Sequence, residues 1–508
     1  MSNKRYKSNL INIIYEYAGD IVTQPDFIPP KRSSFKQYIA YGMSFISVVL
    51  SPQLQANSQC LLQSQINQLQ HIENQIALTE LDNGLILRQV HRPEQATVSI
   101  ASQFNVGSRN EPSGQSGYAH LFEHLLFKGS LNAPADSYPR TMSAIGAQFN
   151  ASTHFDYTNY YATIPAQALA LSLFLEADRF INPVLSAETV NNQQGAVLEE
   201  MATSIDNQPY IRPAMEFLLS QVKGSPYAHA IIGSKQDVTS ATASALQTFH
   251  QRYYRPDAMQ LSLVGHLEED SLALVKQHFS GWTSPNIPHD SFEQLSINAK
   301  AIQTEIVDER GPWPAILMAW HTVGREHADY EAISLLQGYL FQNLRSALAK
   351  QTLASPSHML SYSIPLTMEN HGVTNLVLVP RANTSLNELQ KLTDSLFADI
   401  MAKGMTEQQL CELKTLALSQ QLQQFSHSQT LAKHLSNTAN RDKNAPLTQP
   451  WQRIQAVLPD DISRVTQAYF FDKTVRVDLL PPWYIRWGKS VLEVLPQGMA
   501  ETLEGWAL

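Results

Sequence analysis

Three residues in one short segment have the types and the spacing of a metal-dependent hydrolytic site. The segment Gly117–Phe127 contains His120, Glu123 and His124. On an α-helix, side chains four positions apart project from the same face, so the two imidazoles could bind one ion. Nitrogen ligands of this kind suit Zn²⁺. Glu123 lies beside the pair, where its carboxylate could accept a proton from a water molecule without being a ligand.

This pattern is not expected by chance in a chain of this composition. With 16 histidines among 508 residues, about 0.04 matches to His-x-x-acidic-His are expected. The alternative is a pair of core histidines satisfied by hydrogen bonds, and the rarity of the pattern favours a metal site over it. Four other histidines have no partner at ligand spacing and are predicted to be ordinary: His154, His229, His266 and His321.

The segments around the motif predict alternating strands and helices. Val98, Ile100, Phe104 and Val106 alternate with polar or small residues and predict a half-buried strand. Further strands are predicted within 149–164 and at 261–265, and helices at 165–179 and 271–279. A helix carrying the motif would therefore pack against a sheet.

The second part of the chain repeats this organisation. Strands are predicted at 316–320 and 376–379, and helices at 330–348 and 385–401. The strand–turn–helix unit at 261–279 recurs at 376–401, which indicates two copies of one fold. We expect an α+β class, in which each of two homologous domains has a mainly antiparallel sheet packed against helices.

The same patterns divide the chain into five parts. The predicted parts are an N-terminal extension (1–78), a metal-bearing domain (79–285), a Pro- and Ser-rich linker (286–300), a second domain without metal (301–480) and a C-terminal tail (481–508).

Composition excludes several classes of protein. Hydrophobic residues make up 43% of the 508 residues, enough for two cores and too many for general disorder. The net charge of −9 disfavours nucleic acid as a partner. The two cysteines, Cys60 and Cys411, are too few for a disulfide framework. No apolar run reaches about 18 residues, so a stable membrane span is not expected.

The N-terminal extension has the layout of an export signal. An apolar block at 38–50 follows Lys31, Arg32 and Lys36 and precedes the small residues 56–58, so we assign 38–58 as a signal-like segment. A buried helix is the alternative. Residues 59–78 form a Gln-rich lead-in. The layout favours a periplasmic or secreted protein, with membrane association as a further alternative.

The motif and its surroundings resemble the pitrilysin/insulinase family of inverzincin zinc metallopeptidases, in the short branch that includes the mitochondrial processing peptidases. The matching stretches are Leu81–Gly84, Gly107–Pro112, Gly117–Gly129, Gly146–Tyr161 and Tyr253–Pro256. The resemblance is close over residues 80–280 and extends over 300–480 in pattern only. It implies that this chain forms one half of a clamshell.

The resemblance also implies a ligand set. The family takes its third zinc ligand from a glutamate on a second helix, followed by methionine. Here Glu199 and Glu200 precede Met201, which favours Glu200 and leaves Glu199 as the alternative. Together with His120 and His124, Glu200 would complete three protein ligands, and the open fourth position is typical of a catalytic site.

Two residues after the motif are implied to bind the substrate. Asn150 and Ala151 begin a strand that pairs with the substrate backbone in this family. An edge strand can hold an extended peptide through main-chain hydrogen bonds. The alternative for Asn150 is a turn-forming residue, since asparagine is common where strands begin.

Three positions depart from the family pattern. Gln193 replaces a glutamate that often precedes the third ligand by two helical turns. In the second domain, Tyr339 and Ser355 stand where the family has an Arg/Tyr pair that contacts the substrate carbonyl. We therefore expect this pair to come from a homologous partner subunit, or the chain to act as a homodimer.

The sequence thus predicts a zinc-dependent endopeptidase for short or unfolded polypeptides, with Zn²⁺ as cofactor and Glu123 as general base. A peptide-processing role in the maturation of a cofactor or a bacteriocin would use the same site. The alternative from a different class is a non-catalytic structural or assembly subunit.

Overall fold

The computed structural model describes residues 62–292, 303–342, 346–354, 357–363, 366–381, 384–438 and 446–486. The predicted signal-like segment, Ser355, residues 293–300 of the predicted linker and residues 487–508 of the predicted tail lie outside these ranges. Among the helices so described, none combines the length and the apolar character needed to pass through a bilayer.

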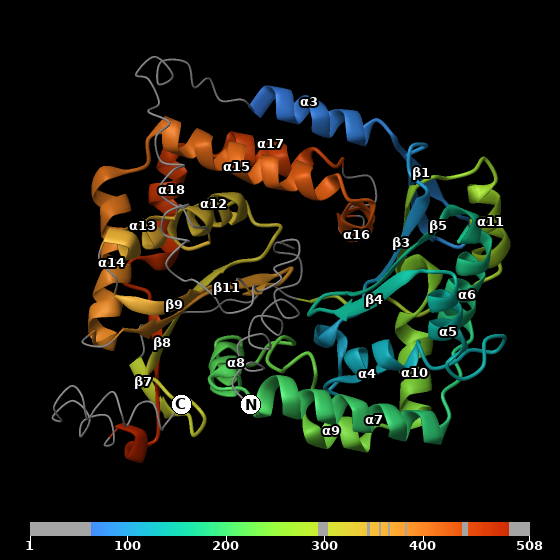
Figure 1. Ribbon diagram of the computed structural model, residues 1–508, viewed down its shortest axis with the longest axis horizontal. Helices are drawn as coiled ribbons and strands as arrows, with labels where there is room; N and C mark the ends of the chain where they lie inside the picture. The colour runs from blue at the N-terminus through green and yellow to red at the C-terminus, as the bar shows by residue number, and fades with distance from the viewer. Residues whose placement is uncertain are drawn as a thin grey trace, which may run out of the picture.

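The first half of the chain forms a six-stranded sheet in the order β1-β2-β6-β3-β5-β4 (Figure 1). Its strands are β1 (Ile76–Glu80), β2 (Ile86–His91), β3 (Thr97–Phe104), β4 (Gln148–Thr153), β5 (Thr158–Pro165) and β6 (Met259–Gly265). Strands β2 and β6 are parallel, and the other neighbours are antiparallel. Strand β1 begins inside the segment assigned to the N-terminal extension.

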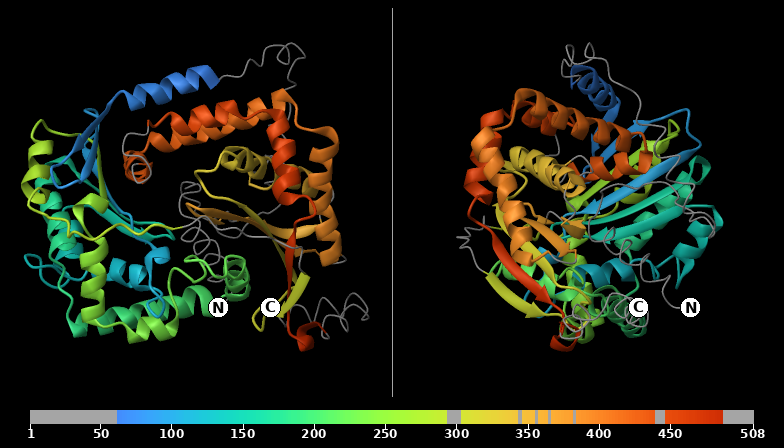
Figure 2. Two further views of the ribbon diagram at one scale, coloured as in Figure 1. Left: turned by 180° about the vertical axis from the view of Figure 1, so that it is seen from behind. Right: turned by 60° about the vertical axis from the view of Figure 1, so that its left-hand side comes forward.

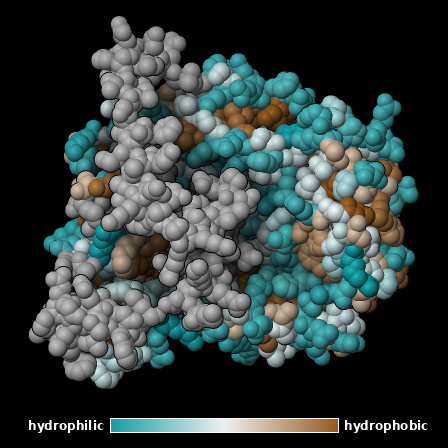
Figure 3. Space-filling view, in the orientation of Figure 1, coloured by the Kyte–Doolittle hydropathy of each residue, from teal (hydrophilic) through white to brown (hydrophobic). Residues whose placement is uncertain are grey.

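Helices cover this sheet and build the first core. They are α4 (Tyr118–Leu125), α5 (Ser137–Ala144), α6 (Leu169–Ile181), α7 (Ala187–Met201), α8 (Ile211–Ser220), α9 (Lys235–Ser240), α10 (Ala243–Tyr253) and α11 (Ser271–Phe279). Leu121, Phe122 and Leu125 of α4 are fully buried in this core. The surface over α6 and α11 keeps several apolar side chains, seen in brown at the right of Figure 3, and Leu171 of α6 is exposed.

The second half builds a sheet in the order β10-β11-β8-β12-β7, with β9 also paired to β11. Its strands are β7 (Gln303–Val307), β8 (Ala315–Val323), β9 (His358–Tyr362), β10 (Leu366–Thr367), β11 (His371–Pro380) and β12 (Val475–Leu480). Its helices are α12 (Tyr330–Leu340), α13 (Ala347–Ala354), α14 (Leu386–Lys403), α15 (Glu407–Phe425), α16 (Ser428–Thr438), α17 (Gln449–Ala456) and α18 (Pro459–Val465).

The two sheets have the same strand order once β1 is set aside. The order β2-β6-β3-β5 corresponds to β7-β12-β8-β11, and each sheet contains one parallel pair at the same place. The predicted α+β class with two similar halves is confirmed. The proposed match between 261–279 and 376–401 is wrong, because it equates β6 with β11, whereas β6 corresponds to β12. Local strand–turn–helix patterns are alike, but pairing with distant strands fixes the position in a sheet.

The prediction of a half-buried strand at β3 is also wrong, because both faces of β3 are covered. Helix α16 packs against β3 and β6 from the side opposite the first core (Figure 1). The contact joins Val90, Ala101 and Val264 of the first sheet to Leu431 and Ala432 of α16. An alternating pattern is not required where helices from another part of the chain cover the second face.

The Gln-rich lead-in becomes a helix, α3 (Leu62–Glu73), that lies along α15 (Figures 1 and 2). Ile66 and Leu69 are buried against Leu418 and Phe425 of α15. The lead-in therefore contacts the helices of the second half before the chain enters the first sheet.

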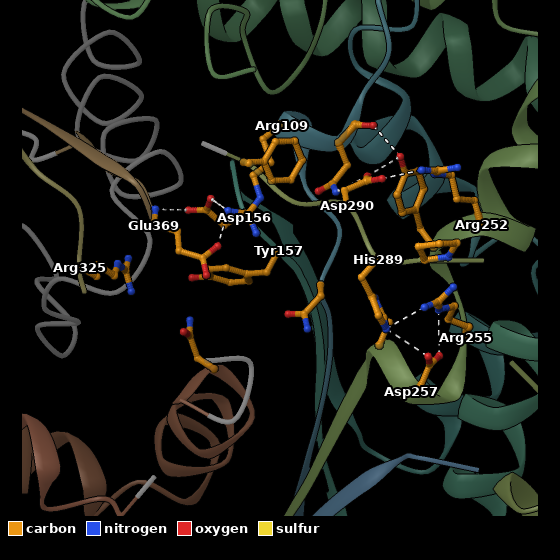
Figure 4. A pocket seen from close by; sticks show the side chains of 17 residues that line it. Arg109, Asp156, Tyr157, Arg252, Arg255, Asp257, His289, Asp290, Arg325 and Glu369 are labelled. Atoms are coloured by element: carbon orange, nitrogen blue, oxygen red, sulfur yellow. Dashed lines mark hydrogen bonds and ion pairs between the residues drawn. The ribbon is translucent and has the colours of Figure 1, made fainter. Parts of the chain in front are cut away.

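The two halves also meet around a polar pocket of about 270 Å³ (Figure 4). Arg109 of the first half forms ion pairs with Asp156 (2.8 Å) and with Glu369 of the second half. On the other side of the pocket, Arg252 pairs with Asp290 (2.5 Å), which lies in the described part of the predicted linker. The Arg109–Glu369 ion pair therefore links the two halves at this pocket.

Candidate metal centre

Helix α4 carries three of the predicted site residues, and a buried carboxylate holds its first turn. Its N-cap, Gly117, has φ 89°, and a Cβ atom there would lie 2.6 Å from the Ile232 carbonyl oxygen, so glycine is required. Glu111 accepts hydrogen bonds from the N–H groups of Gly117 (2.8 Å) and Ala119 (2.7 Å). A negative charge at a helix N-terminus is stabilised by the unpaired N–H groups.

Glu111 is itself paired with a histidine. Its side chain is fully buried, and one of its oxygens lies 2.9 Å from Nε2 of His229. Burial raises the pKa of Glu111, although hydrogen bonds from His229, Ala119 and Gly117 oppose this. Burial acts to lower the pKa of His229, but its hydrogen bond with Glu111 and the charge of Glu111 outweigh burial, and the pKa rises. The sequence predicted His229 to be ordinary, since nothing in its spacing pointed to Glu111.

His120, His124 and Glu200 lie together. Nε2 of His120 is 3.7 Å from Oε1 of Glu200, and Nε2 of His124 is 3.4 Å from Oε2 of Glu200. Two ligand atoms of a tetrahedral zinc ion, each about 2.0–2.1 Å from the metal, are about 3.3 Å apart, so the three side chains fit such an ion. In the part of the chain that the structure describes, this is the only group of three or more metal-binding side chains with such spacing.

The charges of the cluster suit metal binding. Burial lowers the pKa of His120 to about 4, so its imidazole is neutral and keeps a lone pair for a metal. Burial acts to raise the pKa of Glu200, but the hydrogen bond with His124 and the charges of His120 and His124 outweigh it, and the pKa falls. The buried Nδ1 of His120 has no hydrogen-bond partner among the described residues.

Helix α7 explains why Glu200 rather than Glu199 reaches the cluster. The N-cap of the helix is Ser186, whose hydroxyl accepts a hydrogen bond from the Thr189 N–H, and the helix packs against α4. Glu200 is half-buried and faces the two imidazoles, whereas its neighbour Glu199 is exposed. Gln193 is buried on the same helix, two turns earlier.

Glu123 lies beside the cluster, with an exposed fraction of 8%. Oγ1 of Thr153, the last residue of β4, donates a hydrogen bond to Oε2 of Glu123. Thr153 was not among the predicted site residues. The strand pattern indicated where it lies along the chain, but no sequence signal indicated that its hydroxyl would face Glu123.

Among the described strands, β4 is at the edge of the first sheet and pairs with β5 alone. Asn150 is opposite Tyr161, and Ala151 is opposite Tyr160. The Ala151 N–H donates to Oδ1 of Asn150 (2.9 Å). Asn150 thus lies inside the strand, not in a turn before it, and Thr153 at the end of the same strand contacts Glu123.

Of the two second-half positions that depart from the pattern, only Tyr339 is described. It lies on α12, is half-buried and packs against the second hydrophobic core. Its phenol is therefore part of the packing of its own half.

Two protein-family models match the chain. One, "Insulinase (Peptidase family M16)", matches residues 88–232, and the other, "Peptidase M16 inactive domain", matches residues 240–416. An uncharacterised zinc protease of Mycobacterium bovis is 36% identical over 202 residues, which span 40% of this chain and 46% of that protein. This match thus covers less than half the length of that relative.

Two other relatives match over most of their length. Zinc protease PqqE of Helicobacter pylori is 26% identical over 79% of this chain and 92% of its own. The probable mitochondrial-processing peptidase subunit beta of Schizosaccharomyces pombe is 24% identical over 78% of this chain and 90% of its own.

Solved structures share the fold. A protease from Helicobacter pylori superposes with a TM-score of 0.73 at 23% identity, covering 80% of this chain and 99% of that one. The periplasmic protease PqqL from Escherichia coli superposes with a TM-score of 0.67 at 17% identity, covering 85% of this chain and 50% of that one.

Proposed function

Because the chain belongs to the insulinase family of peptidases, M16, we propose that it is a zinc-dependent endopeptidase that hydrolyses peptide bonds in short or unfolded polypeptides. The observation that carries the proposal is the cluster of His120, His124 and Glu200 with Glu123 beside it. Relatives named zinc proteases support the metal and the reaction class.

The residues of the cluster have separate roles in this proposal. His120, His124 and Glu200 would hold the ion and leave one position open. Bound zinc would polarise a carbonyl and make water more acidic. Glu123 would accept a proton from the attacking water and return it to the leaving amine as the peptide bond breaks. The 8% exposed fraction of Glu123 limits competition from bulk water.

Strand β4 would bind the substrate. Its outer edge has no strand partner among the described residues, and Asn150 and Ala151 lie in the middle of it. An extended peptide could add to this edge through main-chain hydrogen bonds, which depend little on side-chain identity. Such binding suits unfolded or short substrates, because a folded domain does not present a free extended segment.

We also propose that a second chain completes the active enzyme. Tyr339 and Ser355 occupy the positions where the family has the Arg/Tyr pair, and Tyr339 packs into its own core. A homologous partner subunit, or a second copy of this chain, would supply groups to the substrate carbonyl. One relative is, by its name, a single subunit of a processing peptidase, which supports this arrangement.

Export from the cytoplasm is supported by the sequence of the N-terminal extension. The segment 38–58 has the layout of a signal. We therefore propose a periplasmic or secreted location.

The test replaces the proposed base and keeps the ligands. Glu123→Gln removes the proton acceptor but preserves shape, so zinc content should stay at the wild-type value while peptide turnover falls by about 10²–10⁴-fold. Zinc is measured by elemental analysis and turnover with unfolded fluorogenic peptides. Glu199→Gln, on the exposed face of α7, is the matched control. Unchanged turnover in Glu123→Gln would exclude the assigned base, and absence of zinc and turnover in the wild type would favour a non-catalytic subunit.

A further inference from the structure

The end of β4 is fixed by the loop that follows β3. The Ser108 N–H donates to the His154 carbonyl (3.1 Å), and the Arg109 N–H donates to the Phe155 carbonyl (3.0 Å). A Cβ atom on Gly107 would lie 2.3 Å from the His154 oxygen, so only glycine allows this approach. The backbone next to Thr153 therefore has one well-defined position.

From this position Thr153 reaches the proposed general base. Its Oγ1 donates a hydrogen bond to Oε2 of Glu123. Side chains alternate along a strand, so Thr153 lies on the same face of β4 as Phe149 and Ala151, which pack against the first core. The strand that would bind the substrate is thus the strand that holds Glu123.

We propose that Thr153 is a positioning residue that fixes the Glu123 carboxylate relative to the substrate-binding edge of β4. This inference rests on the proposed peptidase function. A glutamate side chain has several rotatable bonds, and a base that is free to turn spends less time in the reactive geometry. A hydrogen bond to a charged carboxylate from a residue on a fixed backbone restricts that freedom.

The alternative is that Thr153 only stabilises the sheet. Its neighbour across the pair is Thr158 of β5, whose hydroxyl donates to the Val106 carbonyl (2.8 Å). The same substitution at these two positions removes one hydroxyl from one strand pair, and it is the Thr153 hydroxyl that donates to Glu123. Thr158 is therefore the matched control.

The kinetic test compares Thr153→Val, Thr153→Ser and Thr158→Val. Loss of a hydrogen bond to a charged group should lower kcat of Thr153→Val by about tenfold or more. KM should stay within about twofold, and zinc content should not change. Thr153→Ser keeps the hydroxyl and should recover kcat to within about threefold of wild type. Thr158→Val should lower the melting temperature but not kcat. Equal kcat in wild type and Thr153→Val, or equal losses in both Thr153 variants, would overturn the inference.

A second readout does not depend on activity. Crystal structures of the metal-free wild type and Thr153→Val are compared at the Glu123 side chain. We expect one carboxylate orientation in the wild type and a shifted or divided one in the variant. The same orientation in both would overturn the role of Thr153. If the wild type cleaves no peptide, the proposed function fails, and the crystal comparison still decides whether Thr153 holds Glu123.

Discussion

The two halves of the chain build the same sheet and differ in the helix that follows the central strand. Strands β3 and β8 hold the same position in their sheets, and they lead to α4 and α12. Helix α4 carries His120, Glu123 and His124, whereas α12 contains no histidine and buries Gln337, which donates to Thr374. The fold therefore provides a place for a site, and a few side chains decide whether one forms.

The second half does contain a histidine pair, but of a different kind. Nδ1 of His321 lies 3.2 Å from Nε2 of His371 on the next strand. Burial lowers the pKa of both, that of His371 to about 4. No third metal-binding side chain joins them among the described residues. Two neutral imidazoles without a carboxylate do not match the ligand set proposed for the first half.

The helices also begin differently. Glu111 at the start of α4 is buried, and burial raises its pKa. Asp329 at the start of α12 accepts hydrogen bonds from Arg464 (2.7 Å) and Tyr469 (2.7 Å), and the bond from Arg464 lowers its pKa. Glu111 lies at the start of the helix that carries His120 and His124, and its ion-pair partner, His229, is a titratable side chain.

The largest expected effect comes from removing the carboxylate of the proposed metal site, which distinguishes the first half from the second. Glu200→Gln removes the proposed charged ligand, so zinc affinity should fall by about 10²-fold or more, and turnover with it. Glu199→Gln changes the adjacent residue on the exposed side of α7 and should leave both unchanged. Affinity is measured by competition with a chelator. The opposite ranking of the two variants would assign the ligand to Glu199.

A smaller effect is expected from the edge strand of the first half. Ala151→Pro removes a main-chain N–H from the edge strand β4, and proline is tolerated on edge strands. KM for unfolded peptides should rise by about tenfold through loss of a main-chain hydrogen bond, while the melting temperature changes little. Ala151→Ser keeps the N–H and should retain the wild-type KM. Equal KM values for all three proteins would contradict the proposal that β4 binds the substrate.

The smallest effect concerns pH and the start of α4. The pKa of His229 is raised above its ordinary value of 6.5 in the folded protein. Protonated His229 therefore contributes to the free energy of unfolding. This contribution is fully present below pH 6.5 and is lost as pH rises through the pKa of His229 in the folded protein. The free energy of unfolding, measured with urea, should differ between wild type and His229→Gln by about 1 kcal/mol at pH 6, the usual size for a partly exposed charged pair. At pH 8.5 the difference should be smaller.

The second half supplies the control for that experiment. Asp329 has a pKa below its ordinary value of 3.8, so its stabilisation is lost only as pH falls through the folded pKa. The difference between wild type and Asp329→Asn should thus still be present at pH 8.5, because the partner Arg464 keeps its charge there. An undiminished difference for His229→Gln at pH 8.5 would contradict a protonated His229 beside Glu111.

Features set by neighbours in sequence could be predicted. The helix predicted at 271–279 matches α11 residue for residue, because its apolar spacing and its boundaries are local signals. The spacing of His120 and His124 placed two imidazoles on one helical face, and their ring centroids are 4.7 Å apart. The choice of Glu200 depended on the family resemblance, and its role as ligand stays a prediction.

Features set by distant contacts could not be predicted. Strand β3 was expected to face water on one side, but α16, from the far end of the chain, covers it. The pairing of His229 with Glu111 and the bond from Thr153 to Glu123 join residues on separate elements. Single-sequence patterns carry no information about which separate elements meet, so these contacts appear only when the chain is folded.

The position of α16 means that the halves cannot serve as independent folding units. A protein cut at the predicted linker would leave Val90, Ala101 and Val264 facing water, because α16 belongs to the other fragment. Exposed apolar surfaces of this kind promote self-association and aggregation. Truncation, domain exchange or separate expression of the metal-bearing part would therefore require a substitute for α16.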